Sequence, residues 1–450
     1  MQGILKKFSN MHFLSLLGNG SMSIINMVTV ALLYRSLPIA DNGIWILYQT
    51  VTLFIDTFRH GILNTAFIKF YAGAAKARAE EVIGSTWSIA VTISGFFILL
   101  NIPMFFLISY VQDKAIVLFI KYLAINLIFS LPSLVAICIA QGELRFDRLL
   151  YLRVSNNGLF LLFLLVLFLV NQATLQNIVY ANLLAILSAS LIALFAGWTK
   201  IQFFSKSSTA CVKEIVHFGK FTVGTFISSS LFKITDTFII NFLLGPAALA
   251  IYSLGQRLME IVEIPLRSFV ATAMPSMSAA YNRGEKTEVI YIMQKYIGMI
   301  TLLLIPVLLG AFAFSDLAIG LIGGGKYVGT EAANVFRLFM TFALLFPADR
   351  FFAIGLDVIN KPNINFQKVL VMLVINLVTD FVGIYIFGNV YGITIATLFP
   401  TLFAVIIGYK AMQKHYISFN FWDAYQVGFN ELKSLIRFTL FKKQETFQNH

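Results

Sequence analysis

Long apolar runs recur along the chain and are separated by short polar connections. Each run is close to the length of about 20 residues that an α-helix needs to cross a hydrocarbon core of about 30 Å. The runs lie at residues 12–34, 43–69, 83–109, 115–140, 154–171, 174–198, 217–243, 248–274, 290–314, 330–357, 368–388 and 391–412. The pattern predicts an all-α polytopic membrane protein with about twelve transmembrane helices.

The eighth run is apolar and yet carries several charged residues. At about 100° per residue, Glu260, Glu263 and Arg267 lie within about 40° of Gln256 on one face of a helix. A charge at the centre of a bilayer costs about 2.5–3.5 kcal/mol or more, so this face is expected to look into a bundle interior or a watery cavity.

The second run repeats this arrangement. Gln49, Asp56 and His60 are separated by 7 and 4 residues, the same spacings that separate polar residues of the eighth run. A proline stands just before each run, at Pro38 and at Pro246. The offset of about two hundred residues predicts a six-helix unit used twice in parallel orientation, as in MATE-like transporters.

The composition agrees with a membrane protein. Hydrophobic residues make up 58% of the chain and charged residues 12%, with a mean hydropathy of +0.82, whereas soluble domains are roughly 25% charged. The net charge of +12 is interpreted through the positive-inside rule and not as a sign of nucleic-acid binding, because Lys and Arg gather after the even-numbered runs. Both termini are therefore predicted to be cytoplasmic, and the first run is interpreted as a retained helix without a signal-peptide cleavage site.

The chain is expected to have four parts. Residues 1–198 form an N-terminal six-helix lobe, residues 199–216 a basic cytoplasmic linker, residues 217–412 a C-terminal six-helix lobe, and residues 413–450 a cytoplasmic tail. Within the tail, residues 420–443 place apolar side chains at helical spacing beside four basic ones. This pattern predicts either an interfacial amphipathic helix on anionic lipid or a tail helix packed on the bundle.

Signals of soluble enzymes are absent from the sequence. The glycines of residues 322–327 precede a lysine but lack the spacing and the Ser/Thr of a phosphate-binding loop. The two cysteines, Cys138 and Cys211, and the five histidines show no spacing typical of a disulfide or a metal site. The sequence therefore predicts no metal, no bound cofactor and no enzymatic activity.

Charged pairs inside the apolar runs are the candidate functional groups. Pairs separated by three residues are Asp56 with Arg59, Lys233 with Asp236, and Arg257 with Glu260. A satisfied ion pair can serve helix packing alone, because a buried pair can be neutral for stability once both partners are present. The concentration of charge on corresponding faces of the second and eighth runs favours a central cavity between two lobes.

Several stretches of the sequence resemble one membrane-transporter family. These are FGKFTVGTFISSSLFKITDTFIINFLLGPAALAIYSLGQR and AMPSMSAAYNRG (within residues 218–284), QGELRFDRLLYL (141–152), LIGGGKYVGTEAANVFRLF (321–339) and NLVTDFVGIYIFGNVYGITIATL (376–398). They are similar to the polysaccharide flippase branch, the Wzx-type O-antigen translocases, of the multidrug/oligosaccharidyl-lipid/polysaccharide (MOP) exporter superfamily. Ala250 departs from the family, which usually has glycine at this point.

The resemblance implies a function. Two lobes would enclose a cavity that opens alternately to each side of a bacterial inner membrane and passes an undecaprenyl-diphosphate-linked oligosaccharide outward, for O-antigen or capsule synthesis. The polysaccharide polymerase machinery would be a further partner, beside the membrane lipids. A proton or sodium gradient would drive transport.

The chemistry of this substrate selects the candidate residues. A diphosphate in a low-dielectric site needs cations, and Arg offers it bidentate hydrogen bonds, while sugars need further polar groups. The candidates for substrate binding are Arg59, His60, Asn64, Lys233, Gln256, Arg257, Arg267 and Arg337. The candidates for ion coupling are Asp56, Asp236, Glu260 and Glu263.

Other functions fit the sequence less well. A drug/cation antiporter of the MATE branch would share the twelve-helix plan but would be expected to have an acid-dominated cavity, whereas Arg and Lys are abundant here. A lipid II flippase would usually carry fourteen spans. A membrane glycosyltransferase or ligase would be expected to have large extracytoplasmic loops, and the predicted connections on that side are short.

Overall fold

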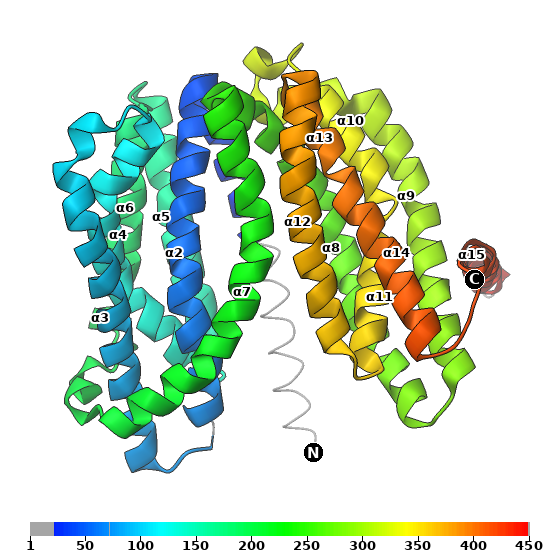
Figure 1. Ribbon diagram of the computed structural model, residues 1–450, viewed down its shortest axis with the longest axis horizontal. Helices are drawn as coiled ribbons and strands as arrows, with labels where there is room; N and C mark the ends of the chain where they lie inside the picture. The colour runs from blue at the N-terminus through cyan, green and yellow to red at the C-terminus, as the bar shows by residue number, and fades with distance from the viewer. Residues whose placement is uncertain (1–21, 72, 449–450) are drawn as a thin grey trace. The chain divides into compact units, whose positions relative to one another are not determined.

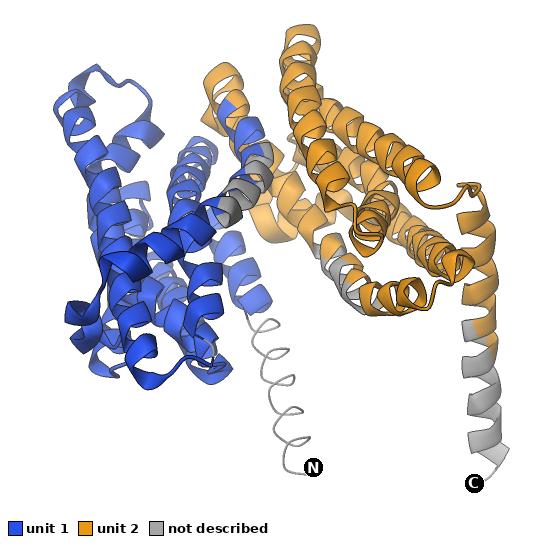
Figure 2. Cartoon of the chain, turned by 60° about the horizontal axis from the view of Figure 1, so that its bottom comes forward, with its two compact units in different colours: residues 1–238 blue, residues 239–450 orange. Residues whose placement is uncertain are grey.

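The computed structural model describes residues 22–71 and 73–448. The chain divides into two compact units, residues 1–238 and residues 239–450 (Figure 2). Within the described residues the regular structure is helical and no strand occurs. In each unit the long helices run side by side, as expected of a helical bundle (Figure 1).

Unit 1 is built from the helices of the first half of the chain. After a helix at Met22–Ser36 come α2 (Ile39–Tyr71), α3 (Lys76–Phe106), η1 (Ile108–Tyr110), α4 (Lys114–Gly142), α5 (Phe146–Leu169), α6 (Leu175–Phe195), η2 (Ile201–Lys206) and most of α7 (Thr209–Leu244). Helix α4 is central, because it packs against α2, α3, α5 and α6.

Unit 2 contains the end of α7 and the remaining helices. These are α8 (Pro246–Asn282), α9 (Lys286–Gly323), η3 (Gly325–Tyr327), α10 (Ala332–Ala343), α11 (Phe346–Val358), α12 (Pro362–Phe387), α13 (Val390–Ala396), α14 (Leu398–His415) and α15 (Asp423–Gln448). Helix α9 packs against α8, α10, α11 and α15.

The predicted spans coincide with these helices. Within the described residues, seven helices are long and apolar enough to cross a membrane, or eight if α10 and α11, which meet at a bend of 44°, count as one broken span. Helices α2, α7 and α8 are not among these seven, but with 33, 36 and 37 residues they are long enough for a crossing. The run predicted at residues 12–34 lies partly outside the described residues, and its described part belongs to the helix Met22–Ser36.

Large apolar side chains are exposed on the outer helices. Examples are Leu99 on α3, Leu309 on α9 and Val374 on α12, each more than half exposed. Soluble proteins rarely leave extended apolar patches in water. These surfaces therefore fit a lipid environment, and the buried cores lie between the helices.

The start of α8 shows why the chain turns where it does. Gly245 has φ +88°, a backbone conformation that side chains rarely adopt, and Pro246 opens the helix as its first residue. Proline suits this position because its missing N–H has no partner inside a helix anyway. Helix α2 likewise begins directly after Pro38, in agreement with the predicted equivalence of the two helices.

The polar segment after α6 packs on α3 within unit 1. Trp87 Nε1 donates to the carbonyl oxygen of Thr199 at 2.9 Å, and Ser88 Oγ donates to Ser207 Oγ at 2.8 Å. Cys211 and Ile215 at the start of α7 are fully buried in a core shared with α2, α3 and α4. The segment predicted as a linker is thus folded against unit 1, while the cytoplasmic location of residues 199–216 stays a prediction.

Candidate functional site

Arg59 on α2 is a fully buried cation within the predicted span 43–69. Its Nη1 donates to Asp56 Oδ1 and to Ser130 Oγ, both at 2.8 Å, and its Nη2 donates to the carbonyl oxygen of Leu127 at 3.3 Å. Ser130 and Leu127 belong to α4. The guanidinium therefore joins α2 to α4, and substrate binding by Arg59 stays a prediction.

The other predicted residues of α2 lie close to this pair. Asp56 keeps 27% of its side chain exposed, so it offers the accessible end of the ion pair. His60 and Asn64 are half-buried, on the next turns of the same helix. The predicted residues of α2 thus lie together on one helix, and the buried cation is bound by contacts within unit 1.

The corresponding pair on α8 is exposed. Arg257 Nη1 lies 3.2 Å from Glu260 Oε2, and the two side chains are 52% and 40% exposed. Arg257 is the twelfth residue of α8, which places it about 16 Å along the helix axis. Half of a hydrocarbon core is about 15 Å, so if α8 crosses a membrane from its first residue, this exposed pair is near the centre.

The remaining predictions on α7 and α8 are only partly described. Gln256 and Glu263 are half-buried, and Asp236 is 3% exposed. Lys233 and Arg267 lie on α7 and α8, but their side chains fall outside the described part of the structure. Their predicted roles in substrate binding therefore stay predictions.

Arg337 on α10 is tied to α9. Its Nη2 lies 2.7 Å from Asp316 Oδ2, its Nη1 donates to Asn334 Oδ1 at 2.6 Å, and its Nε donates to the carbonyl oxygen of Phe312 at 3.4 Å. Asp316 and Phe312 belong to α9. The described contacts bring Arg337 together with α9 and not with the pair on α8.

Helix α12 carries a buried acid that is not among the residues predicted for the site. Asp380 is fully buried, and Asn376 Nδ2 donates to its Oδ2 at 2.8 Å. The sequence shows Asp380 only as one charge in an apolar run, because burial against α13 and α14 comes from tertiary packing. A carboxylate at such a place must be protonated or balanced by a cation.

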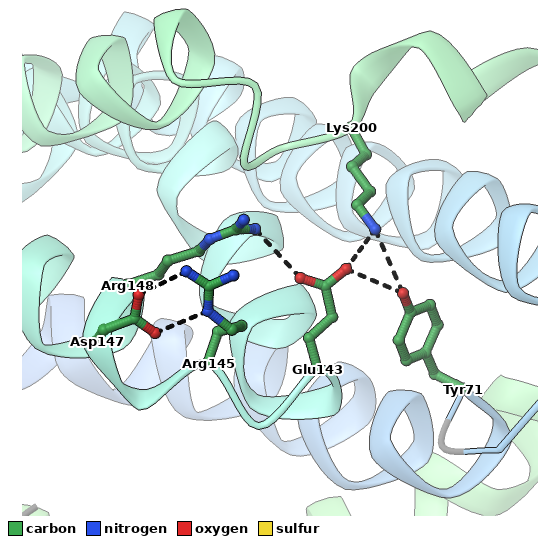
Figure 3. Close-up of polar contacts among 6 residues, drawn as sticks. All are labelled: Tyr71, Glu143, Arg145, Asp147, Arg148 and Lys200. Atoms are coloured by element: carbon green, nitrogen blue, oxygen red, sulfur yellow. Dashed lines mark hydrogen bonds and ion pairs between the residues drawn. The ribbon is translucent and has the colours of Figure 1, made fainter. Parts of the chain in front are cut away.

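A polar network joins several helix ends in unit 1 (Figure 3). Glu143, at the end of α4, accepts from Lys200, from Tyr71 Oη at 3.1 Å and from Arg148 Nη1 at 3.2 Å. Burial lowers the pKa of Lys200, but the hydrogen bonds to Glu143 and Tyr71 outweigh it, so the pKa is raised overall. The network fixes the segment after α6 to the ends of α2, α4 and α5.

The described residues offer no metal centre. No group of three or more His, Cys, Asp or Glu side chains within them is placed to hold a metal ion. The polar groups of the predicted spans form ion pairs and amide–carboxylate contacts, of which the pair of Arg257 and Glu260 is exposed on both sides.

Comparison with known sequences gives one family. The sequence model of a family described as polysaccharide biosynthesis protein matches residues 32–332, which is more than half of the chain. A probable low-salt glycan biosynthesis flippase of Haloferax volcanii is 23% identical over 306 residues, which are 67% of this chain and 61% of that protein. The chain thus spans less than two thirds of this curated relative.

Comparison with solved structures gives the fold. The lipid II flippase MurJ, in an inward closed conformation, matches with a TM-score of 0.73 at 12% identity, over 95% of this chain and 92% of that one. An inward-facing multidrug resistance MATE family transporter of the MOP superfamily matches with a TM-score of 0.72 at 16% identity, over 87% and 94%. A MOP superfamily transporter from Pyrococcus furiosus gives 0.58 at 17% identity, over 89% and 93%.

Proposed function

Because this chain belongs to the polysaccharide biosynthesis protein family and has the fold of MOP superfamily transporters, we propose that it moves a lipid-linked oligosaccharide across a membrane. Its family and fold are those of a multi-pass membrane transporter rather than of an enzyme. The curated relative is named as a glycan biosynthesis flippase and one structural neighbour as a lipid II flippase, which supports this class of substrate.

The exposed pair of Arg257 and Glu260 carries the proposal. A charge that faces lipid at this depth would cost about 2.5–3.5 kcal/mol or more, so an exposed pair there needs a polar path beside it. Arg257 makes one described hydrogen bond, to Glu260, and its guanidinium has five N–H donors. It therefore retains donors for the diphosphate that links an oligosaccharide to its lipid.

We propose that the acids at membrane depth couple this movement to a proton or sodium gradient. To the predicted Asp56, Asp236, Glu260 and Glu263 we add Asp380, which is fully buried. A buried carboxylate gains or loses a proton or a cation at a large cost in free energy, and that cost can be linked to a change of conformation. No bound cofactor is part of the proposal.

The finer assignment follows the sequence prediction. We propose that the lipid is undecaprenyl diphosphate, that the membrane is a bacterial inner membrane, and that both termini lie in the cytoplasm. The basic residues after the even-numbered predicted spans support this orientation. We also propose a functional partnership with the polysaccharide polymerase machinery, as the family resemblance implies.

Deletion of the gene in its own host tests the proposal. The expected result is loss of surface polysaccharide, together with accumulation of diphosphate-linked oligosaccharide on the cytoplasmic leaflet. Complementation with the unaltered chain should restore export, while the variant Arg257→Gln should be inserted into the membrane and restore export only weakly. Unchanged surface polysaccharide would overturn the proposal.

The MATE-type drug/cation antiporter is the alternative that the same strain tests. A structure of a MATE family transporter matches this chain with a TM-score of 0.72, against 0.73 for the lipid II flippase. In such an antiporter, Glu260 would bind a cation. The deletion strain would become sensitive to cationic drugs and would retain cationic dyes, while its surface polysaccharide stayed normal.

A further inference from the structure

Helix α15 crosses α9 at a contact between two glycines. A Cβ at Gly298 would lie 1.8 Å from the carbonyl oxygen of Ala424, and a Cβ at Gly428 would lie 2.3 Å from the carbonyl carbon of Gly298. The two backbones therefore touch, which only glycine permits. Figure 1 views α15 nearly along its axis while α9 runs down the picture, so the helices cross and do not run side by side.

The crossing lies where α9 changes from charged to apolar. Its first ten residues include Lys286, Glu288 and Lys295, whereas residues 296–315 contain no charged residue. This second stretch of 20 residues is long enough to cross a hydrocarbon core. Gly298 is its third residue, so α15 meets α9 at the boundary between membrane and water.

The contacts of Glu431 show which side of α15 faces the membrane. Glu431 pairs with Lys295 and accepts from Tyr291, both of which lie on the charged, N-terminal side of Gly298. Seen down the helix at about 100° per residue, Glu431 lies about 60° to one side of Gly428. That side of α15 therefore faces water.

The opposite side of α15 faces the apolar stretch of α9, residues 296–315. Phe429 lies about 100° from Gly428 in that direction and is 59% exposed. Trp422, in the turn directly before α15, is 70% exposed. Next to Phe429, at about 140° and 180°, are Lys433 and Arg437, both exposed and without an ion-pair partner in the described part of the structure. An aromatic stripe bordered by cations is typical of a helix that lies in a lipid interface.

We propose that α15 is an interfacial helix that binds anionic phospholipid. Trp422 and Phe429 enter the boundary between headgroups and acyl chains, and Lys433 and Arg437 bind phosphate groups of the headgroups. Charge complementarity selects this occupant, because the exposed cations Lys433 and Arg437 lie beside Phe429, while the acid Asp423 of the first turn accepts a hydrogen bond from Asn420. This assignment does not depend on which lipid the chain transports, because α15 packs on α9 and forms no part of the proposed substrate site. Lipid binding by α15 can also be measured without a transport assay.

Site-directed spin labelling of the full chain tests the proposal. In a background with Cys138→Ala and Cys211→Ala, a label is placed at Phe429→Cys, at Trp422→Cys or, as the matched control on the water-facing side of α15, at Ser434→Cys. The protein is reconstituted into phosphatidylcholine vesicles, with or without a third of the lipid as phosphatidylglycerol. Collisions with oxygen report on lipid, and collisions with a water-soluble nickel chelate report on water.

The proposal predicts that labels at 429 and 422 favour oxygen and that the label at 434 favours the nickel chelate. Phosphatidylglycerol should raise the oxygen preference at 429 several-fold, and the double substitution Lys433→Gln/Arg437→Gln should remove this increase. The control Arg283→Gln/Lys326→Gln, which removes the same net charge elsewhere, should leave the increase intact.

Three results would overturn the proposal. The first is equal access of the nickel chelate to positions 429 and 434 in anionic vesicles. The second is a phosphatidylglycerol effect that survives Lys433→Gln/Arg437→Gln. The third is protection of position 429 only after a soluble cell extract is added, which would assign this face to a protein partner.

Discussion

Arg59 and Asp56 form an ion pair in which only the acid reaches the surface. Nη1 of Arg59 lies 2.8 Å from Oδ1 of Asp56, and the arginine side chain is 0% exposed while the aspartate is 27% exposed. Replacement of the acid by an amide would leave a buried charge with neutral acceptors alone, which costs about 3 kcal/mol or more. We therefore expect Asp56→Asn to destabilise unit 1 strongly.

The matched control for this prediction is Glu260→Gln on α8. It also breaks a pair separated by three residues, but that pair is 52% and 40% exposed and should contribute about 1 kcal/mol or less. Thermal unfolding can be followed with a thiol-reactive dye, because Cys138 and Cys211 are fully buried. Equal shifts in unfolding temperature for the two variants would contradict a structural role of the Arg59 pair.

Gly298→Ala should release α15 from α9. The added methyl group would lie 1.8 Å from the carbonyl oxygen of Ala424, so the backbones must separate. Gly310→Ala, on the same helix, is the control, because nothing lies within 4 Å of its added Cβ. Tryptic cleavage after Lys433 and Arg437 should become several-fold faster in the first variant only, and equal rates would show that the crossing does not hold α15.

The docking of α15 should weaken in acid. Hydrogen bonds from Lys295 and then Tyr291 lower the pKa of Glu431 below its ordinary value of 4.5. A depressed pKa means that the pairing is fully favourable above about pH 4.5 and is lost as the pH falls through the lower value. A spin label at Ser434→Cys should gain mobility over this range, whereas with Glu431→Gln its mobility should already be high and independent of pH.

Glu143→Gln should loosen the segment after α6. The substitution removes the carboxylate that binds Lys200, Tyr71 and Arg148 (Figure 3). We expect faster tryptic cleavage after Lys200 and Lys206. Asp147→Asn is the control from a separate pair nearby, because Asp147 binds Arg145 and this pair is about half exposed on both sides. If both variants are cleaved at the rate of the unaltered chain, the network does not hold this segment.

The sequence predicted the helices and the family well. Apolar runs of about 20 residues coincide with the observed helices because length and hydropathy decide membrane crossing. The predicted resemblance to the polysaccharide flippase branch of the MOP superfamily is confirmed by the family match and by the fold. The choice left open for residues 420–443 is partly resolved, since α15 packs on α9, and lipid binding by its other face is our proposal.

The site was less predictable, and Arg59 and Arg257 show why. Both are arginines in an acidic pair on equivalent helices, yet one is fully buried and the other is exposed. The difference comes from Ser130 and Leu127 of α4, which lie far away in the sequence and receive the guanidinium of Arg59. Asp380 was equally hard to place, because its burial depends on neighbouring helices that a helical pattern does not identify.

The central claim is that Arg257 helps to carry a lipid diphosphate through the membrane. Its most direct test uses proteoliposomes that contain a fluorescent oligosaccharide on undecaprenyl diphosphate, with movement between leaflets read by a membrane-impermeant quencher under a proton or sodium gradient. Loss of a charged hydrogen bond of about 1.5–3 kcal/mol predicts that Arg257→Gln lowers the rate about tenfold or more. Arg283→Gln, which breaks an exposed pair outside the helices, should change the rate less than about twofold. Equal rates for Arg257→Gln and the unaltered chain would contradict the account.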